Sequence, residues 1–162
     1  SNAFPNILIN KQNGELRMVK YGVIRTEAGL PVSQRLKSIY EGYTKLIKEC
    51  KPDAIAVEEL FFNKNAKTII TVGEARGIAL LSAALANIEV FEYTPLQVKQ
   101  AVVGYGRAEK AQVQTMVKIL LNLNCVPKPD DAADALAVAI CHINSSNLQG
   151  LSKRGLKDVR LR

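Results

Sequence analysis

Asp131 and Asp134 are two carboxylates near the start of a predicted helix that is otherwise apolar. Pro127 and Pro129 block a helix before this point, and Asp130 is a suitable N-cap residue. Asp131 and Asp134 are three residues apart, so they lie on one face of the helix. The helix dipole favours acids in a first turn, whereas such carboxylates also bind divalent metal ions. This segment alone leaves both explanations open.

A third carboxylate, Glu58, ends a short apolar run over residues 54–58 that is typical of a buried strand. The carboxyl ends of strands are where open α/β sheets place their sites. Glu59 is expected to face the other way, because adjacent strand residues point to opposite faces. We expect no zinc site, because the chain has one histidine and three cysteines without CxxC spacing.

The loop after this strand combines aromatic and basic residues. Phe61 and Phe62 precede Lys64, and a second basic loop contains Arg107. Bases stack on aromatic rings while lysines contact phosphates, so the pattern favours nucleic-acid binding. The alternative is that both phenylalanines belong to the core, but two adjacent residues rarely do.

The elements that must position these residues alternate between strands and helices, which predicts an α/β domain. An Asn-Gly hairpin signal separates the first two strands. The expected strands span 6–10, 16–26, 54–58 and 89–93, and the expected helices 33–49, 66–86, 95–103, 108–123 and 131–142. In the helix over 66–86, Gly73 and Gly77 are four residues apart. Such spacing suits packing within the chain or a symmetric dimer, and we favour the dimer.

The composition is that of a soluble globular domain, with 48% hydrophobic and 23% charged residues in 162. No membrane span or signal peptide is visible, and the cysteines fit a reduced, cytoplasmic setting. Residues 1–3 resemble a cloning remnant, and residues 4–146 form the expected domain. Residues 147–162 form a basic tail, which acts as a phosphate-binding arm or merely as a solvated end; the net charge is +7.

Four segments together carry a resemblance to a known family. They are residues 57–65 (VEELFFNKN), 93–104 (YTPLQVKQAVVG), 107–110 (RAEK) and 129–140 (PDDAADALAVAI). The chain resembles the bacterial RuvC-type Holliday junction resolvases, which are crossover junction endodeoxyribonucleases, from about Tyr21 to about His142. Four motifs in the right order make this resemblance specific.

The resemblance implies an RNase H-like fold, a mixed central sheet flanked by helices, in a homodimer that binds a four-way DNA junction. Each subunit is then expected to nick one strand symmetrically during recombination and repair, beside a branch-migration motor. The implied cofactor is Mg²⁺, for which Mn²⁺ can substitute. Paired ions would help to generate hydroxide and stabilise the leaving oxygen.

The family's functional positions carry over to particular residues. Glu58, Asp131 and Asp134 match three members of the catalytic carboxylate cluster. Phe61 matches an aromatic residue that wedges against bases at the crossover. Basic residues near the scissile phosphate are matched by Lys99 and Lys110. Lys64 and Arg107 are DNA-binding candidates from charge and position, and Phe62 is one from its place in the aromatic loop. His142 is expected to serve as a polar residue at the end of its helix rather than in catalysis.

One family feature has no counterpart in this sequence. The family begins with a strand that ends in Gly-Ile-Asp-Pro-Gly, lies centrally in the sheet and supplies a fourth metal ligand. Without it, two strand edges in the core would be unpaired, at a heavy energetic cost. Residues beyond the given sequence supply this strand, another segment fills the gap, or the sheet is distorted and the site incomplete.

Two functions from different classes therefore stand. The first is an active structure-selective endonuclease whose site gains a further ligand. The second is a catalytically impaired junction-binding dimer. A nuclease of the same fold acting on another substrate is disfavoured by the aromatic loop and the motif around Lys99.

Overall fold

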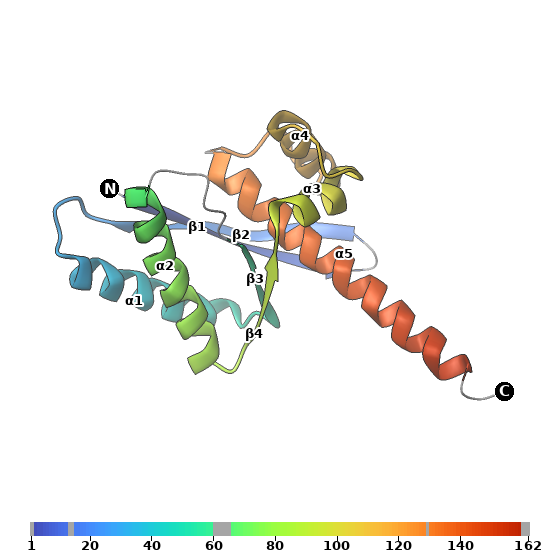
Figure 1. Ribbon diagram of the computed structural model, residues 1–162, viewed down its shortest axis with the longest axis horizontal. Coiled ribbons are helices and arrows are strands. Elements are labelled where there is room, and N and C mark those ends of the chain that lie inside the picture. Colours follow the sequence, from blue (N-terminus) through green and yellow to red (C-terminus); the bar gives the residue numbers. More distant parts are fainter. Residues whose placement is uncertain (1, 13–14, 60–65, 129, 160–162) are drawn as a thin grey trace.

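The computed structural model describes residues 2–12, 15–59, 66–128 and 130–159. Strands and helices alternate in the predicted manner (Figure 1). The elements are β1 (Asn2–Gln12), β2 (Glu15–Thr26), α1 (Val32–Cys50), β3 (Ala54–Glu58), α2 (Ala66–Leu85), β4 (Glu89–Tyr93), α3 (Pro95–Val103), α4 (Lys110–Leu120) and α5 (Asp130–Val159). The predicted Asn-Gly turn lies outside the described residues.

The described strands form two separate two-stranded sheets. β1 and β2 pair antiparallel from Asn2 opposite Thr26 to Gln12 opposite Glu15, with a register shift between Leu8 and Ile9. β3 and β4 pair parallel, with Glu58 opposite Tyr93 at their carboxyl ends. Within the described residues no strand joins the hairpin to β3. Each pair of strands must therefore be held by the helices that pack on it.

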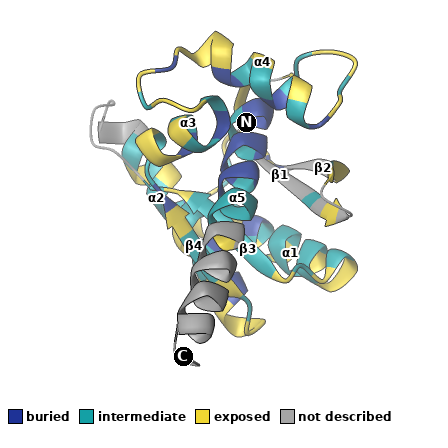
Figure 2. Cartoon of the chain, turned by 90° about the vertical axis from the view of Figure 1, so that its right-hand side faces the viewer, coloured by how far each residue is buried: buried dark blue, intermediate teal, exposed yellow. Residues whose placement is uncertain are grey.

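Helix α5 organises the main core. Its residues Leu136, Ile140 and Cys141 are at most 1% exposed, and they pack against apolar side chains of α3 and α4. The same helix contacts β1, β3 and β4. Figure 2 shows the buried residues concentrated along the upper part of α5. A smaller apolar cluster joins Ile24 of β2 to Ile39 of α1 and Ala75 of α2.

Helix α3 shows how local sequence sets an element's bounds. The Gln97 backbone N–H donates to Thr94 Oγ1 at 3.2 Å, and the Thr94 N–H donates to Gln97 Oε1 at 2.8 Å. Pro95 opens the helix with a compatible φ. Gly104 ends it with φ +97°, a left-handed conformation that glycine adopts without steric cost.

The expectation that the last helix ends at His142 is wrong. Helix α5 continues to Val159 through the segment expected to be a tail, so His142 lies within the helix. No proline follows Pro129 to break the helix. The two later glycines, Gly150 and Gly155, each cost only about 1 kcal/mol relative to alanine, which a helix tolerates. None of the helices in the described part of the chain has the length and apolarity that a membrane crossing requires.

Candidate active site

Glu58 is the last residue of strand β3. The strand is half-buried up to Val57, whereas Glu58 itself is exposed. Just beyond, the Glu59 backbone N–H donates to the Tyr93 carbonyl oxygen at 2.9 Å, which continues the pairing with β4. The position of Glu58 is therefore fixed relative to β4 by backbone hydrogen bonds on either side of it.

Helix α5 presents its acids on the face opposite the core. Ala132 and Ala133 are 2% and 0% exposed, while Asp130 and Asp131 are exposed and Asp134 is half-buried. Asp130 and Asp131 lie in the first turn, where the helix dipole stabilises them. Asp134 lies beyond that turn, where the dipole effect has faded, so its presence on this apolar helix needs another explanation.

A lysine ammonium lies between two of these acids. Lys110, the first residue of α4, places its Nζ 3.3 Å from Asp134 Oδ2 and 3.4 Å from Asp130 Oδ2. Burial disfavours the charge on Lys110, but attraction to Asp134 and Asp130 outweighs it and raises the pKa of the ammonium. The acids at the start of α5 thus already attract one cation.

Helix α5 contacts β3, the strand that carries Glu58. In the described part of the chain, however, no three Asp, Glu, His or Cys side chains lie close enough together to hold a metal ion. Carboxylate oxygens suit Mg²⁺, so the donor chemistry fits this ion. The structure brings Asp130, Asp134 and Lys110 together without gathering Glu58, Asp131 and Asp134 into one ligand set.

A second contact between the strands and α5 involves residues that the sequence did not single out as a pair. Tyr93 Oη and His142 Nδ1 are 2.8 Å apart, and the His142 ring centroid lies 4.4 Å from that of Phe91. Burial lowers the pKa of His142, although the charge of Glu89 opposes this effect. Strand alternation could place Tyr93 on a buried face. No sequence signal pairs it with a residue 49 positions away.

The family follows from comparison with known proteins. The profile of the crossover junction endodeoxyribonuclease RuvC family matches residues 6–142. The chain belongs to the RuvC family. A RuvC of Caldanaerobacter subterraneus subsp. tengcongensis is 57% identical over 141 residues, covering 87% of this chain and 86% of that protein. A RuvC of Desulforamulus reducens is 61% identical over 132 residues, covering 82% and 81%.

Solved structures confirm the RNase H-like α/β fold. The Thermus thermophilus RuvC structure superimposes with a TM-score of 0.81 at 32% identity, covering 91% of this chain and 89% of that one. T. thermophilus RuvC in complex with a Holliday junction substrate gives a TM-score of 0.83 at 33% identity, covering 88% and 87%. The chain is thus a RuvC nuclease by family and by fold.

The DNA-binding candidates of this RuvC are only partly described. Phe61, Phe62 and Lys64 lie outside the described residues. Lys99 is half-buried on α3 and Arg107 is exposed just before α4. Of the three predicted basic residues that the structure describes, Lys99, Arg107 and Lys110, it is Lys110 that forms ion pairs with acids of α5.

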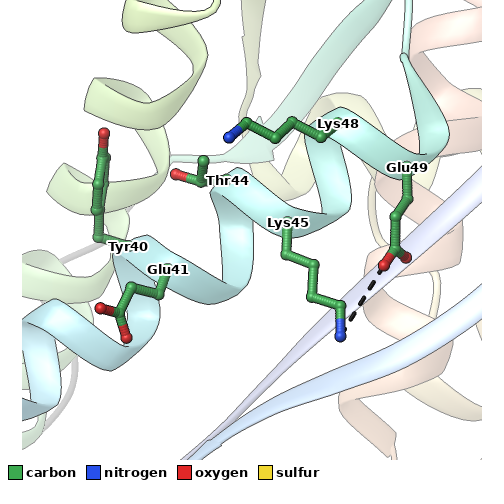
Figure 3. Close-up of a pocket in the computed structure, with 6 residues that line it drawn as sticks. All are labelled: Tyr40, Glu41, Thr44, Lys45, Lys48 and Glu49. Carbon is green, nitrogen blue, oxygen red and sulfur yellow. Dashed lines mark ion pairs between the residues drawn. The ribbon is translucent and has the colours of Figure 1, made fainter.

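A hollow of about 390 Å³ lies elsewhere, along α1 (Figure 3). All of its lining residues come from this one helix: Tyr40, Glu41, Thr44, Lys45, Lys48 and Glu49. Lys45 Nζ and Glu49 Oε1 form an ion pair at 3.9 Å within it. Because one helix supplies the whole lining, the hollow is a strip of surface between side chains, and we assign it no catalytic role.

Proposed function

We propose that this protein is a structure-selective endonuclease that resolves four-way Holliday junctions by paired, symmetric nicks during recombination and repair. The observation that carries the proposal is the family match over residues 6–142. The solved relative in complex with a Holliday junction has the same fold over most of both chains. The pairing of Lys110 with two acids at the start of α5 adds a local feature suited to phosphate chemistry.

Glu58, Asp131 and Asp134 are the proposed catalytic residues and would hold Mg²⁺, with Mn²⁺ as a substitute. The bound ion would supply a Lewis acid that activates water and offsets charge at the scissile phosphate. Glu58 is held by the backbone pairing of β3 with β4, and the two aspartates by the first turns of α5. Lys110 remains protonated beside Asp134, so its ammonium is available to pair with a phosphate oxygen.

The remaining DNA contacts are assigned by position. Lys99 and Lys110 are proposed to bind near the scissile phosphate, and Arg107 to bind the backbone of an arm. Phe61 is proposed to wedge against bases at the crossover, with Phe62 and Lys64 beside it. Phosphate contacts fix position and orientation on DNA, while aromatic stacking favours unpaired bases, so the set suits a branched substrate.

A homodimer is proposed to form through α2. Its side chains Ile70, Leu81 and Leu85 are 63%, 49% and 63% exposed although they are large and apolar. Between them, Gly77 is exposed and has no atom within 4 Å of where a Cβ would stand, so a second backbone can approach closely. A twofold dimer would give two nicking sites for two symmetric strands. We further propose a cytoplasmic setting beside a branch-migration motor.

A second candidate function is a catalytically impaired dimer that binds junctions without cutting them. Two observations favour it: the described acids do not form a three-ligand metal site, and no described strand joins β1 to β3. If the chain is active, a further carboxylate must join Glu58 and Asp134.

The test is cleavage of an end-labelled four-way junction with Mg²⁺ or with EDTA, after the intact mass of the protein has been checked. We expect paired nicks that require Mg²⁺. Glu58→Gln, and Asp131→Asn with Asp134→Asn, should abolish nicking and leave junction affinity unchanged. Glu59→Gln is the matched control and should cut normally. Nicking that survives Glu58→Gln would contradict the assigned site, whereas tight binding without nicks by the unaltered protein would establish the second candidate.

A further inference from the structure

We propose that Tyr93 is a positioning residue that couples the strand carrying Glu58 to the helix carrying Asp131 and Asp134, acting through His142. This inference rests on the proposed function, because it concerns how that site is kept in register. The juxtaposition that carries it is a single tyrosine bonded to β3 by its backbone and to α5 by its side chain.

The backbone of Tyr93 is part of the β3–β4 pairing. Tyr93 is opposite Glu58 in the parallel register, and its carbonyl oxygen accepts the Glu59 N–H at 2.9 Å. A displacement of Tyr93 would therefore be transmitted to the end of β3, where the Glu58 carboxylate begins.

The side chain of Tyr93 reaches α5. Tyr93 is 9% exposed, and its Oη lies 2.8 Å from Nδ1 of His142. Phe91 lies two residues earlier on the same face of β4 and packs its ring against the same imidazole at 4.4 Å. One side chain of α5 is thus held by two side chains of β4, one through a directional hydrogen bond and one through ring packing.

The pKa shifts of the two partners favour a bond in which the tyrosine donates and the imidazole accepts. Burial lowers the pKa of His142 and so favours the neutral imidazole, in which Nδ1 can accept a hydrogen bond from the Tyr93 hydroxyl. Burial, together with Cys141, raises the pKa of Tyr93, which keeps its hydroxyl as a donor.

Helix α5 connects His142 rigidly to the acids near its start, Asp131 and Asp134. His142 and Asp134 are eight residues apart on one continuous helix, a rise of about 12 Å. Apolar packing of Ile140 and Cys141 buries the helix, and the hydrogen bond at 2.8 Å adds a directional contact to β4. The Tyr93–His142 bond therefore sets the rotation and axial position of α5 relative to β3.

The first experiment compares Tyr93→Phe with Tyr105→Phe. The control removes a hydroxyl whose bond has the same length, since Tyr105 Oη donates to Gln112 Oε1 at 2.8 Å, but that bond is exposed and joins the α3–α4 connection to α4. We expect Tyr93→Phe to slow single-turnover nicking at saturating protein about tenfold, because a misplacement of about 1 Å can cost a hundredfold. Junction affinity should change less than about twofold, and Tyr105→Phe should match the unaltered protein in both measurements. Equal rates for the two variants, or equal losses of rate and affinity in Tyr93→Phe, would overturn the inference.

The second experiment tests whether Tyr93 acts through His142. His142→Phe keeps a ring against Phe91 and removes the Nδ1 acceptor. If the two residues act as one unit, the double variant should nick no more slowly than either single variant. Multiplied rate losses would show independent effects and overturn the inference.

A third measurement needs no nicking and so separates this inference from the proposed function. In backbone amide NMR spectra, His142→Phe should shift the Glu58 and Glu59 resonances in the unaltered background and leave them unchanged in the Tyr93→Phe background. Unshifted resonances, or equal shifts in both backgrounds, would overturn the coupling. If the unaltered protein makes no nicks, the proposed function fails while this measurement still decides the coupling.

Discussion

At the scale of single residues, the chain brings opposite charges together at the start of α5. Asp130 and Asp134 hold the ammonium of Lys110, and all three side chains are between 45% and 65% exposed. Exposed ion pairs contribute about 0–1 kcal/mol, so this arrangement adds little to folding stability. Its effect is on charge: the two carboxylates raise the pKa of the Lys110 ammonium, and another cation or a phosphate would have to compete with this pairing.

His142 predicts how the stability of the folded protein depends on pH. It is the one histidine of the chain, and burial lowers its pKa below the ordinary value of 6.5. As pH falls through that value, the unfolded chain takes up a proton before the folded chain does, so folded stability falls. Stability should therefore be fully present above about pH 7 and decline toward about pH 5.

Urea unfolding of the unaltered protein and of His142→Phe across this range measures the effect. The variant should lose part of the decline between neutral and acidic pH, since it has no imidazole to protonate. Parallel pH profiles for the two proteins would show that His142 titrates alike in the folded and unfolded states.

At the scale of elements, local signals predicted some bounds and missed others. The expected strand 89–93 and helix 95–103 agree with β4 and α3, because Thr94, Pro95 and Gly104 act within a few residues of the ends that they set. Helix α5 was expected to end at His142, since no nearby signal distinguishes a solvated tail from a continuing helix. The Tyr93–His142 contact was missed for a different reason: periodicity indicates which face is buried but not which distant residue covers it.

The capping box of α3 predicts a measurable stability difference. Thr94→Ala removes the Oγ1 that accepts from the Gln97 N–H, which should lower the free energy of unfolding by about 1 kcal/mol. Thr115→Ala is the matched control, because its Oγ1 donates to the Ala111 carbonyl within α4, where alanine is the better helix former. Urea unfolding should show the control to be neutral or slightly stabilised. Similar losses in both variants would mean that the cap contributes nothing specific.

At the scale of the whole molecule, the chain has two small sheets that share one long helix. β1 and β3 each have an edge that no described strand pairs, and α5 contacts both strands. The family's central strand is expected at this place in the sheet, and none of the described strands occupies it. Among the described residues, helix packing therefore holds the two pairs of strands together. A further carboxylate for the proposed site would come from the segment that lies beside β1 and β3.

The other whole-molecule feature is the exposed apolar face of α2, on which the proposed dimer rests. Large apolar side chains are normally exposed singly, whereas α2 has Ile70, Leu81 and Leu85 around an open Gly77. Burying this face between two copies would place one nicking site on each side of a twofold axis. Leu81→Arg should then shift the molecular mass in sedimentation equilibrium from dimer to monomer, because it would bury an unpaired charge in the interface.

Ile119→Arg is the matched control for this prediction, since Ile119 is 61% exposed on α4, away from the α2 face. It should remain dimeric and make paired nicks. A Leu81→Arg monomer should still cut, but each junction should receive single unpaired nicks, so the yield of fully resolved duplexes should fall by more than the total nicking rate. A Leu81→Arg protein that remains dimeric would place the interface on another surface. A monomeric variant that still makes paired nicks would show that symmetric cutting does not require a symmetric dimer.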